Sequence, residues 1–141
     1  MDCCENPLND KVVVTDTLAG IGTGHLENFL AHALCMDGEA SFDFNGSRFQ
    51  LKKGDLMIVR KGKLIENFEQ SPDFTVKVIY LESSFVEAST PNTNYGMKGS
   101  LALFLNPVMR LSEFQFNLCN EDFRNVEFRH KATCYKFYFS R

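Results

Sequence analysis

The dipeptide Asn45-Gly46 lies between two segments in which apolar and polar residues alternate. Asn-Gly in this position favours a two-residue type I′ turn, because both turn positions need a positive φ angle. Such a turn fixes the register of the strands that it joins, since a slip of one residue would move every side chain to the opposite face. The predicted cross-strand pairs are Phe44–Ser47, Asp43–Arg48, Phe42–Phe49 and Ala40–Leu51.

This register gives the hairpin one apolar face and one polar face. The polar face carries the opposed charges of Asp43 and Arg48. The apolar face carries Ala40, Phe42, Phe44, Phe49 and Leu51. An antiparallel pair with one face in the core and one in water has this pattern. We therefore expect a hairpin that covers a hydrophobic core.

The segment 25–36 is predicted to be a long strand, and it is apolar at nearly every position. One face carries Leu26, Leu30, Leu34 and Met36 together with His32, and the other carries Phe29, Ala31, Ala33 and Cys35. A strand that is apolar on both faces is buried on both. We expect one face to meet a barrel interior and the other to meet a second sheet or a partner.

Further strand-like segments follow the hairpin, each bounded by Gly, Pro, Asn or Asp. They cover residues 56–59, 64–68, 74–81 and 101–105. Short strands at intervals of roughly 8–12 residues are typical of an all-β sandwich or barrel. The segment 89–99 is rich in turn-forming residues and is expected to close one end. The glycine-rich segment 18–26 precedes a strand rather than a helix, so we expect a flexible loop and not a phosphate site.

A helix is predicted to begin at Ser112. Ser112 and Gln115 have the spacing of a capping box, and Asn106-Pro107 marks the preceding break. Apolar residues then recur at helical spacing at Phe116, Cys119, Phe123 and Val126. This stripe fits two arrangements equally well, packing against the barrel and a dimer interface.

The composition limits the partners of the chain. Its net charge is −3 and it has no group of five or six Lys and Arg residues, so it lacks the basic surface typical of nucleic-acid binding. It has no apolar run of about 18 residues to span a membrane, and we expect no secretory signal. Its five cysteines form no C-x-x-C pair, which favours free thiols in a reducing cytoplasm, with Cys35 and Cys119 as small core residues.

The run GEASFDFNGSRFQLKKGDLMIVRKGKL (residues 38–64) resembles the N-terminal cupin domain of AraC-type transcriptional regulators. The continuations DFTVKVIYLESSF and NYGMKGSLALFLNPVMRLSEFQF are similar to regulators of this type from Bacteroidales-like bacteria. The likeness extends over about residues 20–139. It implies an all-β fold with a C-terminal α-helix, namely a cupin or double-stranded β-helix jelly-roll barrel.

The resemblance also implies an organisation and a set of partners. Residues 1–110 would form the cupin-like barrel with an N-terminal extension, and residues 111–141 a C-terminal helical segment that is cut short. Family members bind a small-molecule effector in the barrel and dimerise through helices after it. They bind DNA through a separate domain with two helix-turn-helix units, which is expected to be absent from this chain. We therefore expect an unknown effector, a homodimer and no direct DNA binding.

Metal-dependent cupins carry two histidine-containing motifs, and this chain departs from both. The first motif matches His32 and Glu39, but Leu34 stands in place of its second histidine. In the second motif Ile65 replaces the histidine. A catalytic metal typically needs at least three protein ligands. We therefore predict no metal, no other cofactor and no catalytic residue.

What remains is a pocket at one mouth of the barrel. Its candidate polar residues are His32, Arg60 and Tyr80, and its candidate walls are Phe42 and Phe49. Arg60 would bind a carboxylate if it points inward, or it is a solvated loop residue. His32 is either a contact to ligand or an interior histidine with satisfied hydrogen bonds.

These observations predict the effector-binding and dimerisation domain of a cytoplasmic AraC-type regulator. Two alternatives stay open. One is a small stand-alone cupin enzyme with an atypical metal site that uses His32 and Glu39. The other is a degenerate remnant with neither ligand nor partner.

Overall fold

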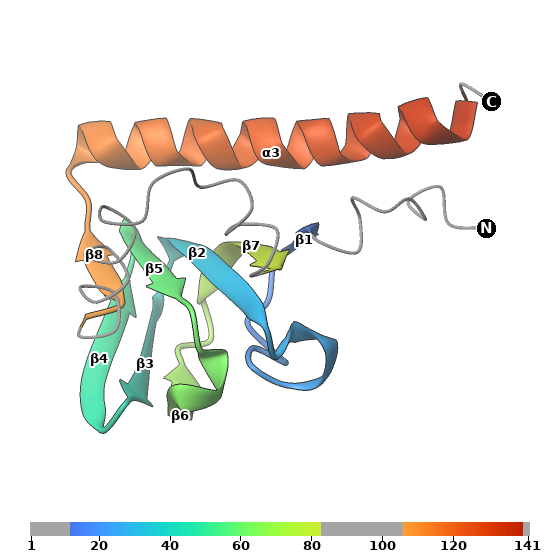
Figure 1. The fold of residues 1–141 in the computed structure, drawn as a ribbon. Coiled ribbons are helices and arrows are strands. Elements are labelled where there is room, and N and C mark those ends of the chain that lie inside the picture. The colour runs from blue at the N-terminus through green and yellow to red at the C-terminus, as the bar shows by residue number, and fades with distance from the viewer. Residues whose placement is uncertain (1–11, 83–105, 140–141) are drawn as a thin grey trace, which may run out of the picture.

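The computed structural model describes residues 12–82 and 106–139 and shows two antiparallel sheets and a long C-terminal helix (Figure 1). The larger sheet has the order β1 (Val12–Thr15), β7 (Thr75–Glu82), β2 (Phe29–Asp37), β5 (Asp55–Val59) and β8 (Val108–Arg110). The three-stranded sheet has the order β4 (Ser47–Lys52), β3 (Glu39–Phe44) and β6 (Ile65–Gln70). Helix α3 spans Glu113–Phe139. The predicted all-β fold with a C-terminal helix is confirmed.

The hairpin at Asn45-Gly46 has the predicted turn and register. Asn45 and Gly46 both have positive φ angles, 51° and 85°. The cross-strand pairs between β3 and β4 are the four predicted from the sequence, Phe44–Ser47, Asp43–Arg48, Phe42–Phe49 and Ala40–Leu51. The turn chemistry alone was sufficient to fix which residues face the core.

The interior between the two sheets is filled by small and aromatic side chains. From the three-stranded sheet, Phe42, Phe44 and Leu51 are buried. From the larger sheet, the contributors include Ala31, Ala33, Cys35, Met57, Val59, Val78 and Tyr80. Phe42 lies 6.1 Å from Phe49 between ring centroids. Phenylalanine side chains of the three-stranded sheet therefore pack in the same cluster as the alanines of β2.

The outer face of the larger sheet is covered by α3. Leu34 of β2 and Ile79 of β7 form a second buried cluster with Phe123 of the helix. The helix begins with the predicted capping box: the Gln115 amide donates to the Ser112 hydroxyl at 3.1 Å, and the Ser112 amide donates to the Gln115 side chain at 2.9 Å. The larger sheet is thus buried on both faces around Leu34 and Ile79 and partly buried toward its edges.

Two expectations about the segment before β2 are wrong. The strand begins at Phe29 rather than at residue 25, because residues 24–26 form a short 3-10 helix, η1 (Gly24–Leu26). The segment 18–26 is not loose, because Leu18 and Leu26 are both buried in the interior cluster. Successive turn hydrogen bonds run along it, including Ile21 N–H to Leu18 O at 3.1 Å and Thr23 N–H to Gly20 O at 3.0 Å. Residues 18–26 therefore form a closing segment for one end of the barrel.

The closing segment is held against the β5–β6 connection by contact between two glycine backbones. Gly62 lies in a second 3-10 turn, η2 (Gly62–Leu64), which follows β5. A Cβ atom on Gly62 would lie 2.7 Å from the Gly22 nitrogen, and one on Gly22 would collide with the Gly62 carbonyl. Gly22 also has a φ of +72°, which only glycine adopts readily. No side chain fits between the two segments.

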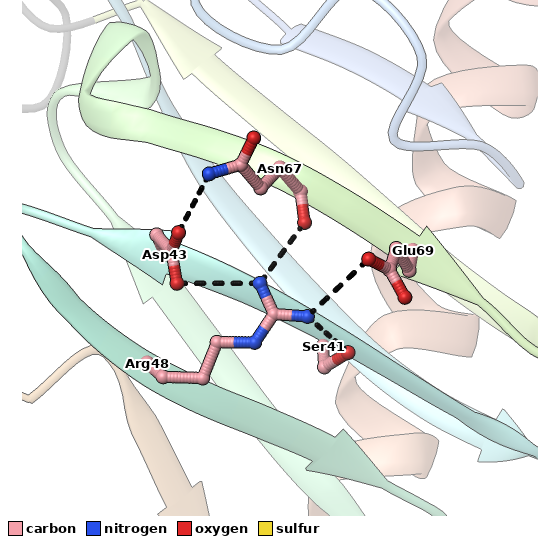
Figure 2. A network of polar contacts seen from close by, with 5 residues as sticks. All are labelled: Ser41, Asp43, Arg48, Asn67 and Glu69. Carbon is pink, nitrogen blue, oxygen red and sulfur yellow. Dashed lines mark hydrogen bonds and ion pairs between the residues drawn. The ribbon is translucent and has the colours of Figure 1, made fainter.

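The solvent face of the three-stranded sheet is cross-linked by Arg48 of β4 (Figure 2). Its guanidinium donates to the Ser41 hydroxyl at 2.9 Å, to Asp43 at 3.2 Å and to the Asn67 carbonyl at 3.2 Å. Asn67, at a positive φ of 52°, also donates to Asp43 from its side-chain amide at 2.7 Å. The hydrogen bonds from Asn67 and Arg48 lower the pKa of Asp43. This network joins β3, β4 and β6 where the β3–β6 register shifts.

The expected strand at 101–105 and the expected loop at 89–99 lie outside the described residues. The structure adds two edge strands that the sequence did not predict, β1 and β8. β8 comes directly after Asn106-Pro107 and pairs with β5. Within residues 12–82 and 106–139, no helix is both long and apolar enough to cross a membrane.

The glycine contact predicts unequal effects for two substitutions in the closing segment. Gly22→Ala introduces a methyl group where the Gly62 backbone lies, and it also strains a positive φ. Gly24→Ala is the matched control, because its φ is +55° and nothing lies within 4 Å of the added atom. We expect a loss of about 1 kcal/mol for Gly24→Ala, from the backbone conformation alone, and about 3 kcal/mol for Gly22→Ala. Urea unfolding measures both, and equal losses would show that the contact is unimportant.

Candidate functional site

Tyr80 is a polar side chain of the interior cluster. It lies on β7 opposite Val13 of β1 and Ala31 of β2, and Ala31 lies in turn opposite Val59 of β5. These four residues form a layer across the larger sheet, and all belong to or pack against the interior cluster. Val59 ends β5 just before the connection that contacts the closing segment. The Tyr80 layer is therefore the one near that end of the barrel.

The hydroxyl of Tyr80 is buried without a hydrogen-bond partner. The residue is only 1% exposed, and no described residue donates to or accepts from its hydroxyl. Burial raises the pKa of Tyr80 to about 12, so the phenol stays protonated and neutral at physiological pH. A buried hydroxyl that makes no hydrogen bond is destabilising by about 1–3 kcal/mol. This interior therefore contains a polar group that a bound molecule would satisfy.

Phe42 and Phe49, the predicted walls, lie in the same interior cluster as Tyr80. Phe42 is fully buried and also stacks on Phe68 of β6, with 6.3 Å between ring centroids. Phe49 is only partly buried. The structure thus brings together three of the five residues predicted to form the pocket, Phe42, Phe49 and Tyr80.

The expectation that His32 points into the barrel is wrong. His32 lies opposite Ile58 and Ile79, on the same face of β2 as Leu34, which is the face covered by α3. Burial lowers the pKa of His32, and a hydrogen bond with the Ile79 backbone opposes that shift in part. Its Nδ1 atom has no partner among the residues that the structure describes. His32 is a mostly neutral histidine of the sheet's outer face.

Arg60 is exposed and lies just beyond the end of β5. Of its two predicted roles, this exposure favours the solvated loop residue. It is nevertheless at the same end of the barrel as the closing segment, because Gly62 follows in the same connection. From this position Arg60 would meet a molecule at the rim rather than one in the interior.

The residues that match the metal motif do not converge. Glu39 is exposed and alternates with the inward Ala40, whereas His32 faces α3. Ile65, where the motif has a histidine, packs against the interior cluster. Among the described side chains, no group of three His, Cys, Asp or Glu residues lies close enough to hold a metal ion.

The apolar stripe of α3 faces the larger sheet. Phe123 is buried, and the other three residues of the stripe, Phe116, Cys119 and Val126, pack against the same outer cluster. Of the two arrangements left open by the sequence, the structure shows packing against the barrel. Burial raises the pKa of the Cys119 thiol, and Asp122 adds to this effect. Cys35 is likewise buried, with its thiol pKa raised to about 11.

A second apolar row on α3 was missed in the sequence. Phe114, Leu118 and Phe128 are 72%, 53% and 71% exposed, which is unusual for large hydrophobic side chains. At 100° per residue, these positions lie within one narrow arc, on the side of the helix opposite Phe123. Their spacing of four and ten residues is the signal that would have revealed the row.

A groove of about 600 Å³ also lies beside α3, on the helix side of the larger sheet. Its lining includes Met36, Ile79 and Phe123, together with Lys77. The Lys77 ammonium donates to the Asn120 side chain at 2.9 Å. The sheet separates this groove from the interior that contains Tyr80.

The two sheets lie largely within the segment that matches a known family. Residues 24–108 match the model of the AraC-like ligand binding domain. The match covers more than half of the sequence, and the chain belongs to this family. The predicted cupin-type fold is thereby confirmed. No match was found among curated proteins.

Two solved structures show a weaker likeness. The ethanolamine utilization protein Q of Salmonella typhimurium is 15% identical, with a TM-score of 0.31, over 51% of this chain and 49% of that protein. The EutQ protein of Clostridium difficile is 13% identical, with a TM-score of 0.31, over 52% of this chain and 50% of that protein. The chain thus spans about half the length of these two proteins.

The lowered pKa of His32 predicts a loss of stability in acid. The unfolded chain takes up a proton near pH 6.5, whereas folded His32 does so only at a lower pH. The free energy of unfolding should therefore fall as the pH drops below about 6.5, by at most about 1.4 kcal/mol per pH unit. His32→Leu should flatten this decline between pH 7 and pH 5, measured by urea unfolding. Both proteins should respond alike between pH 8 and pH 9, and parallel curves in acid would contradict the prediction.

Proposed function

We propose that this chain binds a small-molecule effector inside its barrel and acts in a transcription regulator, where it passes occupancy of the site to a DNA-binding partner. The observation that carries this proposal is the Tyr80 hydroxyl, which is buried without a partner in the interior of an AraC-like ligand binding domain. Ligand sites are mostly apolar and carry a few placed polar groups. Tyr80 among Phe42, Val59 and Ala31 has that composition.

A binding role is favoured over catalysis by the direction of the motif residues. Glu39 and His32 are the two that match the metal motif, and neither points into the interior. Tyr80 keeps its proton at neutral pH, as an ordinary tyrosine does, and burial raises its pKa further. A protonated phenol is suited to holding a ligand by a hydrogen bond rather than to taking a proton from it.

The proposal is tested by ligand-induced stabilisation of the wild-type chain and of Tyr80→Phe. Without ligand, Tyr80→Phe should be more stable by about 1 kcal/mol, because it removes an unsatisfied hydroxyl and keeps the ring. Thermal unfolding is then followed with a panel of sugars, organic acids and aromatic alcohols. A bound compound at 100 times its dissociation constant should add about 2.7 kcal/mol to the wild type and clearly less to the variant.

Ile79→Val is the matched control for this experiment. Ile79 is the neighbour of Tyr80 on the same strand, but it faces α3. It should lose about 1 kcal/mol of stability and keep the full ligand response. A panel in which no compound stabilises the wild type would contradict effector binding. Equal responses of wild type and Tyr80→Phe would contradict the site.

We also propose that the chain forms a homodimer through the outward row of α3. This row, Phe114, Leu118 and Phe128, is apolar and exposed, whereas the stripe around Phe123 is occupied by the sheet. Phe114 and Phe128 lie equally far along the helix from Glu121. In an antiparallel pair with a two-fold axis at Glu121, Phe114 of each copy would meet Phe128 of the other. With this axis, Glu121 would meet Glu121 of the second copy, and the ion pair of Glu121 with Arg124, at 3.6 Å, would offset part of that like charge.

The dimer is tested with the double variant Phe114→Ala/Phe128→Ala. Sedimentation equilibrium should show a dimer for the wild type and a monomer for the double variant at about 10 μM protein, because the two aromatic contacts across the axis are lost. Gln50→Ala is the control, since Gln50 is exposed and belongs to β4 of the three-stranded sheet rather than to the helix. A monomeric wild type, or a double variant that still dimerises fully, would contradict the interface.

A further inference from the structure

We propose that the effector is a neutral and largely apolar molecule that bears one hydrogen-bonding oxygen, which pairs with the Tyr80 hydroxyl. This inference rests on the proposed function and narrows the chemical class of the ligand. It follows from three observations about the described interior: its one unsatisfied polar group, its apolar surroundings and the absence of a counter-charge near them.

The Tyr80 hydroxyl is the group to which the ligand would form a hydrogen bond. A phenol can donate one hydrogen bond and accept others, so it pairs with a carbonyl, ether or hydroxyl oxygen alike. The Tyr80 hydroxyl is the unsatisfied polar atom of the interior cluster among the described residues, since the other such atom, Nδ1 of His32, is on the α3 side. A ligand with one polar oxygen can satisfy it. Each further hydroxyl of a sugar would be buried beside apolar side chains without a partner.

The surroundings of Tyr80 define the rest of the molecule. The side chains in its layer are Val13, Ala31 and Val59. Leu18 and Leu26 of the closing segment and Phe29 at the start of β2 complete this end of the cluster. These side chains offer dispersion contacts and no hydrogen bonds. A ring or branched hydrocarbon body is the shape of ligand that such a surface favours.

The charges of the described interior disfavour a ligand that carries a carboxylate. Asp55 is the one charged side chain of the described residues that is buried, at 4% exposure. Its carboxylate accepts from the Lys52 amide at 2.9 Å, at the opposite end of β5 from Val59. No buried cation of the described part of the chain is present to pair with a ligand carboxylate. An unpaired charge buried in apolar surroundings is strongly disfavoured.

Arg60 supports one alternative ligand class, a carboxylate bound at the rim. It lies at the rim on the Tyr80 side of the barrel, and it is exposed. A carboxylate ligand would need to keep its charge at the rim beside Arg60 and to extend its body inward. Binding of this kind would depend on Arg60 and would not require the Tyr80 hydroxyl, so substitutions of the two residues separate the two ligand classes.

The test compares ring compounds that share a skeleton and differ in charge. The probes are benzyl alcohol with benzoate, and cyclohexanol with cyclohexanecarboxylate, with glucose as a polyhydroxylated neutral compound. Dissociation constants are measured by calorimetry for wild type, Tyr80→Phe, Arg60→Ala and the control Ile79→Val. Each neutral ring compound should bind at least about 100-fold tighter than its carboxylate partner. Tyr80→Phe should weaken it about 2- to 10-fold, the value of one hydrogen bond, whereas Arg60→Ala and Ile79→Val should not.

Each contrary result overturns a different statement. Carboxylates that bind as tightly as their neutral partners, and lose affinity in Arg60→Ala, would overturn the ligand class and leave effector binding intact. Neutral probes that bind wild type and Tyr80→Phe equally would overturn the anchor. Tight binding of glucose would overturn the single-oxygen requirement. Failure of all five probes at 10 mM would overturn this class alone, because the broader panel that tests the proposed function would still decide whether an effector binds.

Discussion

The larger sheet is apolar on both faces, and the rest of the described structure depends on covering them. Along β2, Ala31 and Cys35 face the interior while Leu30 and Leu34 face the other way, and all four are buried. Leaving one such leucine in water would forgo about 1.5–3 kcal/mol. The three-stranded sheet covers one face and α3 covers the other (Figure 1). The barrel and the helix therefore form a single unit in which the sheet is the shared wall.

Consecutive residues of each strand in the larger sheet face opposite sides, so the interior and the α3 side share the same backbone. Tyr80 and Ile79 are consecutive on β7, with Tyr80 in the interior and Ile79 against Phe123 of α3. A ligand that shifts Tyr80 also shifts the backbone on which Ile79 is carried. If α3 joins two copies of the chain, effector binding and dimerisation act on the same strand, and the influence of one on the other is reciprocal. Because Ile79 packs with Phe123 in the outer cluster, a displacement of β7 would also act on the helix.

Local chemistry explains which parts of this structure the sequence could predict. Asn45-Gly46 specifies the hairpin register, and Ser112 with Gln115 specifies the start of α3, because in each case the residues involved contact one another. The direction of His32 was not predictable in this way. Both faces of β2 are apolar, so alternation separates them without showing which one is inside, and pairing with β5 and β7 decides it. The prediction took the His32 face of β2 as the interior face, whereas it is the face toward α3.

The interior hydroxyl is the feature that packing alone does not account for. The chain has 14 phenylalanines, and Phe at position 80 would fill the same space without burying a polar atom that lacks a partner. Other polar side chains are well paired, as at Arg48 on the solvent face, whose guanidinium contacts Ser41, Asp43 and Asn67 (Figure 2). A residue that lowers stability without a structural return is typical of a functional site. The hydroxyl of Tyr80 is therefore better explained by a ligand than by the barrel itself, and its apolar surroundings are what limit the charge and polarity of that ligand.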